Sequence, residues 1–171
     1  MSEKTEILNV DVSVLFDIIE LGILEDMFKL DYDYQTSEYI ILEIKRDNQK
    51  QAIKNHIDNG ALKVHNVNTF KKVFDLQDEF PGLSIPDCSL VELSEMNNGT
   101  LLCSDQKLCN VCSDNGVSSI GIFKIIEQLV NYSIIKRDHA IELLNEYPKI
   151  NKWAAPMSEI EKEKTIYTCE S

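Results

Sequence analysis

Short apolar runs alternate along the chain with longer segments whose apolar residues recur at helical spacing. The runs that indicate strands are residues 7–10, 34–36, 62–67, 100–104 and 117–121. The segments that indicate helices are residues 13–28, 37–44, 49–58, 69–80, 84–97, a short stretch ending at 115–116, 122–135 and 137–147. This alternation is typical of a sheet covered by helices on both faces. We therefore predict a three-layer α/β/α domain with a mainly parallel central sheet.

Turn and capping residues set the predicted ends of the helices. Gly22 interrupts the apolar stripe of residues 13–28, and Ser37 is placed to cap the next helix. The pairs Asn59-Gly60 and Asn98-Gly99 are typical helix stops. From residue 154 the periodicity fades into a mixed-charge segment. We predict one domain over residues 1–150 and a C-terminal tail over 151–171 that is mobile or bound to a partner.

Composition and charge restrict the classes of function. The chain has 171 residues, 43% of them hydrophobic, which is enough for the core of one domain. Its formal net charge of -12 argues against broad attraction to nucleic acid, so any such function needs a local basic patch. The first ten residues lack a secretion pattern, and no segment approaches the roughly 18 apolar residues of a membrane helix. We expect a soluble cytoplasmic protein that does not use a membrane.

The cysteines offer one short motif. Five cysteines cannot all pair within one chain, and in a cytoplasmic protein we expect the thiols to stay reduced. Cys109 and Cys112 form a CxxC, but a second pair with zinc-site spacing is absent from the sequence. Buried inert thiols are therefore favoured over a metal or redox site.

Four acidic residues stand where a parallel sheet would place a ligand. Asp11 and Asp105 follow the first and fourth predicted strands, Asp87 lies in the first turn of a helix, and Glu43 lies on the helix after the second strand. Ligands of such sheets bind outside the carboxyl ends of the strands. Carboxylates gathered there repel each other unless a cation lies among them, and carboxylate oxygens suit Mg²⁺ or Mn²⁺. A metal held in this way can activate water and stabilise a phosphate, which suits phosphodiester hydrolysis.

The stretches "ILNVDVSVLFDIIELGIL", "TSEYIILEI", "SIPDCSLVEL" and "LLCSDQKL" resemble the four acidic motifs of the PIN domain family in their usual order. The resemblance covers roughly residues 6 to 147. It implies a three-layer metal-dependent nuclease that acts mostly on single-stranded RNA, and many prokaryotic members are toxins that pair with an antitoxin protein. It assigns Asp11, Glu43, Asp87 and Asp105 as metal-binding catalytic acids and Ser13 as a supporting polar residue. It also implies pairing through helical faces, and the apolar faces of residues 14–24 and 122–135 are large enough to contribute to such a contact as well as to the core, so we expect a homodimer.

Basic residues near these acids are candidates for holding the RNA backbone. Lys45 and Arg46 follow Glu43, and Lys107 follows Asp105, so all three are predicted to rim the cleft and bind substrate. For Lys45 and Arg46, an ordinary solvated helix face is the favoured alternative.

Two neighbouring acids and two other functions also have to be weighed. Asp114 could supplement Asp105, although a loop residue is the simpler interpretation, and Asp17 is interpreted as structural. A receiver-type signalling domain also uses an acidic pocket at the strand ends, but it needs a lysine on a late strand, and residues 117–121 have none. A PIN-like binding module that has lost catalysis remains the other alternative.

Overall fold

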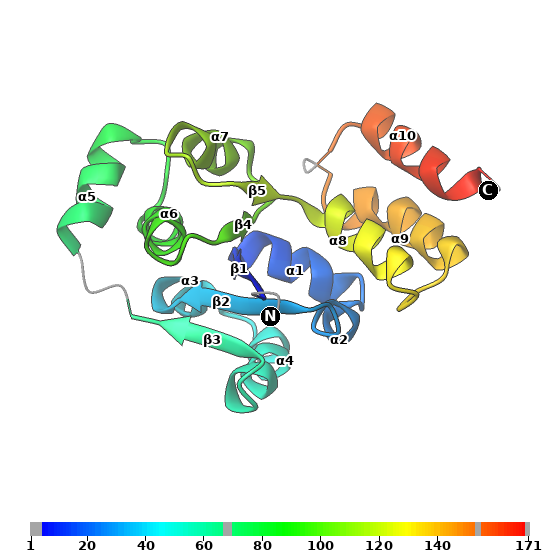
Figure 1. Ribbon diagram of the computed structural model, residues 1–171, viewed down its shortest axis with the longest axis horizontal. Coiled ribbons are helices and arrows are strands. Elements are labelled where there is room, and N and C mark those ends of the chain that lie inside the picture. The colour runs from blue at the N-terminus through cyan, green and yellow to red at the C-terminus, as the bar shows by residue number, and fades with distance from the viewer. Residues whose placement is uncertain (1–4, 67–69, 153–154, 170–171) are drawn as a thin grey trace.

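The computed structural model describes residues 5–66, 70–152 and 155–169. Residues 67 and 69, at the ends of a predicted strand and helix, and residues 153, 154, 170 and 171 of the predicted tail, lie outside these ranges. The five predicted strands are confirmed, and they form one all-parallel sheet in the order β3-β2-β1-β4-β5 (Figure 1). The strands are β1 (Glu6–Val10), β2 (Tyr32–Ser37), β3 (Leu62–His65), β4 (Thr100–Leu102) and β5 (Ser119–Ile120).

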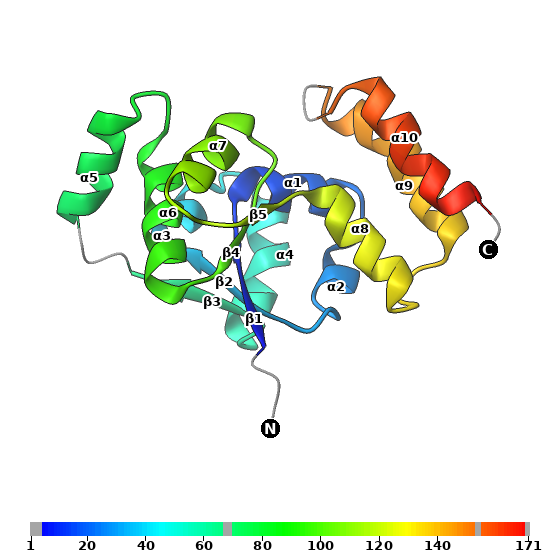
Figure 2. The ribbon, with the colours of Figure 1, turned by 45° about the horizontal axis from the view of Figure 1, so that its top comes forward.

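Helices cover both faces of this sheet, as Figures 1 and 2 show. One layer contains α1 (Val12–Glu20), α2 (Leu24–Met27), α4 (Asp47–Asp58), α8 (Ile122–Asn131) and α9 (Arg137–Ile150). The other contains α3 (Glu38–Glu43), α5 (Phe70–Glu79), α6 (Ile85–Asn97) and α7 (Gln106–Asp114). Successive strand residues point to opposite faces, so Leu8 and Val10 pack into the first layer while Asn9 meets α6. The predicted three-layer α/β/α architecture is therefore confirmed. Across the described ranges, no helix combines the length and apolar character needed to cross a bilayer.

The helix ends follow the turn chemistry of the sequence. Gly22 has a φ of 73° and separates α1 from α2, a conformation that glycine adopts without steric strain. The hydroxyl of Ser37 caps α3 by accepting the backbone N–H of Ile40 at 3.4 Å. One helix is shorter than predicted: α8 ends at Asn131 because Ser133, with a φ of 59°, turns the chain. That turn brings Ile135 into the core.

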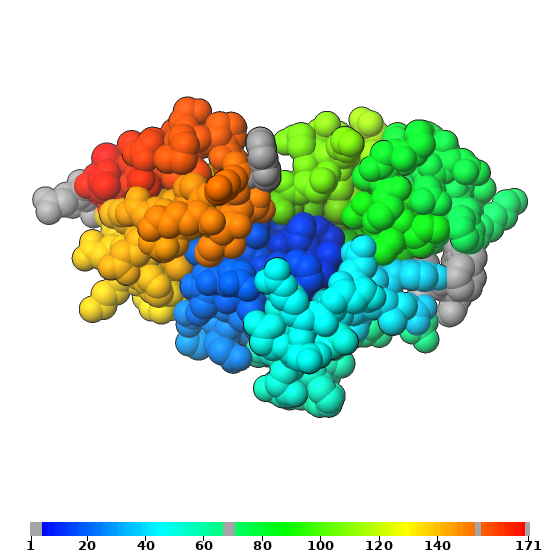
Figure 3. Space-filling model, turned by 180° about the vertical axis from the view of Figure 1, so that it is seen from behind, coloured from blue at the N-terminus to red at the C-terminus, as the bar shows by residue number. Residues whose placement is uncertain are grey.

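The structure differs from the prediction after residue 154. Residues Met157–Thr168 form a helix, α10, that packs along α9, where the sequence predicted a mobile or partner-bound tail (Figure 3). Ile160 and Tyr167 are buried in the core, and Arg137 donates a hydrogen bond to the carbonyl of Cys169 at 3.1 Å. These two apolar residues lie seven positions apart on one helix face. Two buried residues are too few to give a helical pattern of apolar positions that can be detected in the sequence.

Candidate active site

The strand order places a topological switch point at the carboxyl edge of the sheet. The chain runs outward from β1 to β2 and β3, then returns to β4 on the other side of β1. The gap between β1 and β4 is therefore the topological switch point, where ligands of such sheets bind. Asp11 stands directly after β1 at this point, and its backbone N–H donates to the carbonyl of Leu102 in β4 at 3.0 Å.

Two serine hydroxyls surround the Asp11 carboxylate. Ser13, the predicted supporting residue, donates its hydroxyl proton to Oδ2 of Asp11. The hydroxyl of Ser104, just after β4, lies 3.3 Å from that of Ser13. Because the Ser13 proton is directed at Asp11, Ser104 is placed to donate to Ser13. The sequence interpretation missed Ser104, since a lone serine beside an aspartate carries no distinctive pattern.

Three of the four predicted acids share one electrostatic environment. Burial raises the pKa of Asp11 to about 6, the Ser13 hydrogen bond opposes this rise, and the charge of Asp87 adds to it. The pKa of Glu43 is also raised, first by burial and then by the charges of Asp87 and Asp11. We call Asp11, Glu43 and Asp87 the acid group. Among the described residues, no ion pair joins any of the three to a basic side chain.

Asp87 is held by the first turn of its own helix. Its Oδ2 accepts the backbone N–H and the hydroxyl of Ser84, each at 2.8 Å, and its own N–H donates to the Ser84 hydroxyl at 3.2 Å. This capping box explains why α6 begins here, after Ser84 and with Pro86 in the first turn.

A second set of polar contacts fixes α6 against the strand ends. The hydroxyls of Ser37 in β2 and Ser89 in α6 lie 2.6 Å apart, and Thr36 donates its hydroxyl to the carbonyl of Val10 at 2.8 Å. These contacts tie the carboxyl ends of β1 and β2 to the helix that carries Asp87. They hold the strand ends and the helix that carry the acids, and they involve none of the acid side chains.

The buried side chain of Asn9 anchors the far end of the same helix. Its amide donates to the hydroxyl of Ser94 at 3.0 Å and exchanges hydrogen bonds with Asn97 at 3.1 and 2.8 Å. The Asn97 amide also donates to Gln35 of β2 at 3.2 Å. The sequence interpretation missed this network, because its members lie far apart in the chain and a polar residue inside a strand gave no signal.

Asp105 occupies a different position from the other three acids. It is exposed at the N-cap of α7, where its Oδ1 accepts the backbone N–H of Leu108 at 3.0 Å. Since Ser104 faces Ser13 and Asp11, the next residue along the chain turns away toward its own helix. Asp11, Glu43 and Asp87 are thus linked by their charges, while Asp105 is engaged at the start of α7.

The acid group has the right donors for a hard cation, although its side chains are not gathered around one point. Among the described residues, no three acids, histidines or cysteines form a closed group that could hold a metal. Asp87 is engaged through its Oδ2 and Asp105 through its Oδ1, each in capping a helix. The donor chemistry nevertheless fits Mg²⁺ or Mn²⁺, because carboxylates that repel one another and form no ion pair among the described residues are stabilised by a divalent cation.

The candidate substrate-binding cations belong to two different parts of the chain, the segment that follows α3 and the start of α7. Lys45 and Arg46 line a hollow of about 350 Å³ together with Glu43. Arg46 approaches Glu20 at 3.9 Å, and Lys45 donates to the carbonyl of Leu42 at 2.8 Å. Lys107 is exposed in the first turn of α7, next to Gly82.

The remaining predicted residues have structural positions. Asp17 is buried and accepts hydrogen bonds from the Tyr147 hydroxyl at 3.3 Å and the Asn151 amide at 3.0 Å, in agreement with its predicted structural role. Asp114 is exposed at the end of α7.

The cysteines differ from the sequence prediction. Cys103 and Cys109 are joined by a disulfide, so the prediction that all the thiols stay reduced is wrong for this pair. The turn from β4 into α7 brings them together, with their Cα atoms 6.8 Å apart. Cys112, the second cysteine of the CxxC, is buried and free, and burial raises the pKa of its thiol to about 12.

Comparison with known proteins identifies the family. No curated protein matches the sequence. A family model described as a PIN domain matches residues 7–159, which include β1 from its second residue, β2 through β5 and the whole acid group. PIN domains are generally nucleases and generally use divalent metals. The match extends over most of the chain, and the chain therefore belongs to the PIN domain family.

Proposed function

We propose that this chain is an endoribonuclease that uses Mg²⁺ or Mn²⁺ to hydrolyse phosphodiester bonds of single-stranded RNA. One observation carries the proposal: burial and the charge of Asp87 raise the pKa of both Asp11 and Glu43, and among the described residues no ion pair joins any of the three acids to a basic side chain. Such an arrangement is unfavourable for stability and favourable for binding a cation. Family membership supports the nuclease class, and it argues against a receiver-type signalling domain.

The chain's own residues would divide the work as follows. Asp11, Glu43 and Asp87 would hold the metal, with Asp105 contributing from the rim. When bound, the metal supplies an activated water and a positive charge for the phosphate. Ser13 orients the Asp11 carboxylate, and the hydrogen bonds of Ser37 with Ser89 keep the helix of Asp87 at the strand ends.

Substrate attraction depends on few cations. With a net charge of -12, the surface repels RNA over most of its area. Lys45 and Arg46 line the hollow that contains Glu43, which supports a role in guiding the RNA backbone, and we assign the same role to the exposed Lys107 in the first turn of α7. We expect RNA binding to weaken sharply when the metal is removed.

The biological setting is also part of the proposal. We propose that the chain is the toxin of a toxin–antitoxin pair in the cytoplasm, a role that a small neighbouring gene for a partner protein would support. Homodimerisation remains a prediction for light scattering to test. The apolar residues of α1 and α8, on which it was based, are buried in the chain's own core. A dimer would therefore need other surfaces, such as the one around the exposed Tyr132.

The test is cleavage of a labelled single-stranded RNA in Mg²⁺, in Mn²⁺ and in excess chelator. We expect cleavage only with metal, and a loss of roughly hundredfold or more for Asp11→Asn and Asp87→Asn. Asp105→Asn should also lose most activity while remaining folded, because its carboxylate contributes to holding the metal. Asp114→Asn, an exposed acid at the other end of α7, is the control and should cleave normally. Cleavage that persists in chelator would contradict the proposal.

A second candidate is a module that binds RNA without cleaving it. It is favoured by the lack, among the described residues, of three acids that close around one point. RNA binding without metal-dependent products, under conditions in which the protein is folded, would support this candidate over the nuclease.

A further inference from the structure

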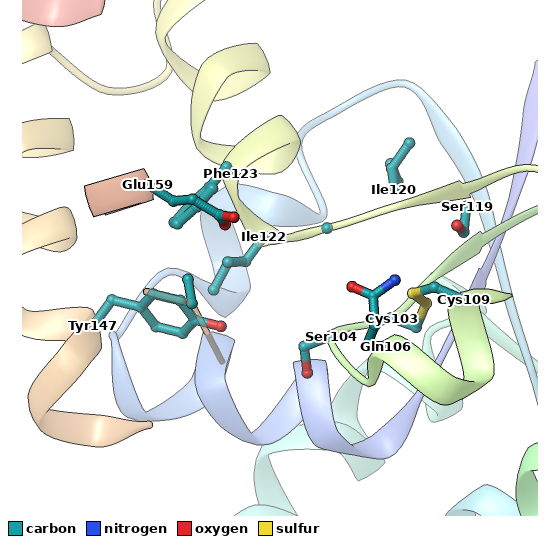
Figure 4. A pocket seen from close by; sticks show the side chains of 12 residues that line it. Cys103, Ser104, Gln106, Cys109, Ser119, Ile120, Ile122, Phe123, Tyr147 and Glu159 are labelled. Carbon is teal, nitrogen blue, oxygen red and sulfur yellow. A yellow bond between two sulfur atoms is a disulfide. The ribbon is translucent and has the colours of Figure 1, made fainter. Parts of the chain in front are cut away.

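A cavity of about 210 Å³ opens beside the acid group at the carboxyl edge of β4 and β5 (Figure 4). The turn from β4 into α7 forms one wall through Ser104 and Gln106. The first residues of α8, Ile122 and Phe123, form another, and Tyr147 of α9 also lines the cavity. In Figure 4 the carboxamide of Gln106 and the ring of Tyr147 approach the cavity from opposite sides.

The chemistry of the lining is neutral and mixed. Ser104, Ser119 and Gln106 offer hydroxyl and amide groups, while Ile122 and Phe123 offer apolar surface. Among the described residues that line the cavity there is no lysine or arginine, and Glu159 is the one charged side chain. A phosphate would be repelled here. A flat, neutral ring with donors and acceptors on its edge matches this lining, because nucleobases are bound by apolar contacts on their faces and hydrogen bonds on their edges.

The cavity is connected to the acid group by direct contact. Ser104 lines the cavity, and its hydroxyl lies 3.3 Å from that of Ser13, which in turn donates to Asp11. An RNA strand with a phosphate at the acid group would therefore have a neighbouring base at the cavity. The volume is below the roughly 300–1,000 Å³ of typical small-molecule sites, so it suits a single ring system.

We propose that this cavity is a subsite for one nucleobase of the RNA strand, adjacent to the phosphate that is cleaved. This inference rests on the proposed function, since it places the phosphate at the acid group. Gln106 contacts the base edge through its carboxamide, whose amide now donates to Asn110 at 2.8 Å. By binding one base, the subsite fixes which phosphate of the strand lies at the acid group. Surface cations cannot do this, because they contact phosphates that are alike along the strand.

The experiment is a scan of a short single-stranded RNA in which each nucleotide in turn is made abasic. Affinity is measured by fluorescence anisotropy, with Ca²⁺ replacing Mg²⁺ to slow cleavage. Wild-type protein should lose about tenfold in affinity at one position only, the size expected for one base contact. In Gln106→Ala, and in Ser119→Phe, whose ring would fill the cavity, this position-specific loss should disappear.

Gln51→Ala is the matched control. Gln51 is exposed on α4 and donates to Asn55 four residues later at 3.1 Å, as Gln106 does to Asn110, but it lies outside the cavity. It should reproduce the wild-type scan.

The outcomes separate this inference from the proposed function. A flat scan on wild-type protein that still cleaves RNA would overturn the subsite and leave the nuclease standing. A position-specific loss without any metal-dependent cleavage would support the subsite and overturn the nuclease. Failure to bind any RNA would overturn both.

Discussion

Replacing Asp11 with asparagine should make the metal-free protein less sensitive to rising pH. The folded-state pKa of this carboxyl is raised from 3.8 to about 6, first by burial. A raised folded-state pKa means that the protonated form stabilises the fold. That stabilisation is fully present below about pH 3.8 and is lost as the pH rises through about 6. In wild-type protein the whole shift corresponds to a loss of about 3 kcal/mol, and the part between pH 5 and pH 8 to about 1–2 kcal/mol.

Asp11→Asn removes this titration but keeps an oxygen that can accept the Ser13 hydroxyl. The new amide group needs an acceptor and costs about 1–3 kcal/mol if it finds none, but that cost does not depend on pH. The informative quantity is therefore the difference in unfolding free energy between variant and wild type. It should shift by about 1–2 kcal/mol in favour of the variant from pH 5 to pH 8.

The assay is urea unfolding in chelator at each pH, where the shift corresponds to roughly 0.5–1 M in midpoint. Asp114→Asn, an exposed acid, should show no such trend against wild type. A difference for Asp11→Asn that is constant with pH, or that shifts toward wild type as the pH rises, would refute the claim that Asp11 is a buried, uncompensated charge.

Three further substitutions test the supporting structure. Ser13→Ala removes the hydrogen bond to Asp11 and should reduce single-turnover cleavage by about tenfold while the protein stays folded; an unchanged rate would count against its role. Ile160→Ala should lower the unfolding free energy in urea by about 2–4 kcal/mol, because it empties a buried site. Ile166→Ala, which is 54% exposed on the same helix, should change it by less than about 0.5 kcal/mol; equal effects would mean that α10 is not packed on α9. Asn9→Leu leaves its partners on α6 unpaired and should destabilise the protein by about 1–3 kcal/mol in the same assay, and no change would contradict the anchoring role of this network.

Local features of the sequence predicted much of the fold. Gly22 and Ser37 act at the helix ends as their chemistry requires, and Asp11 follows its strand as the alternation indicated. These predictions succeed because capping and glycine conformations depend on a few consecutive residues. The charges of Asp87 and Asp11 act on Glu43, but the role of these acids as metal ligands, which came from parallel-sheet topology together with the family resemblance, stays a prediction.

Features that depend on distant contacts could not be predicted in this way. Ser104 matters because β4 lies beside β1, so its role is defined by a residue far away in the chain. Asp105 was expected to point into the cleft, but it lies beyond the end of β4, and its Oδ1 caps α7 by accepting the backbone N–H of Leu108. Helix α10 was missed because Ile160 and Tyr167 bury a stripe only two residues long. The Cys103–Cys109 disulfide depends on the geometry of one turn, which the CxxC spacing did not indicate.

Calorimetric titration of Mn²⁺ into the metal-free protein tests the central claim most directly, because it measures binding at the acid group without requiring the right RNA. Wild-type protein should bind the ion, Asp11→Asn and Asp87→Asn should each lose most of that affinity, and Asp114→Asn should bind like wild type. Each of the two losses is expected because a carboxylate oxygen and a full negative charge leave the site. Equal binding by wild type, Asp11→Asn and Asp87→Asn would show that the metal lies elsewhere and would contradict the account.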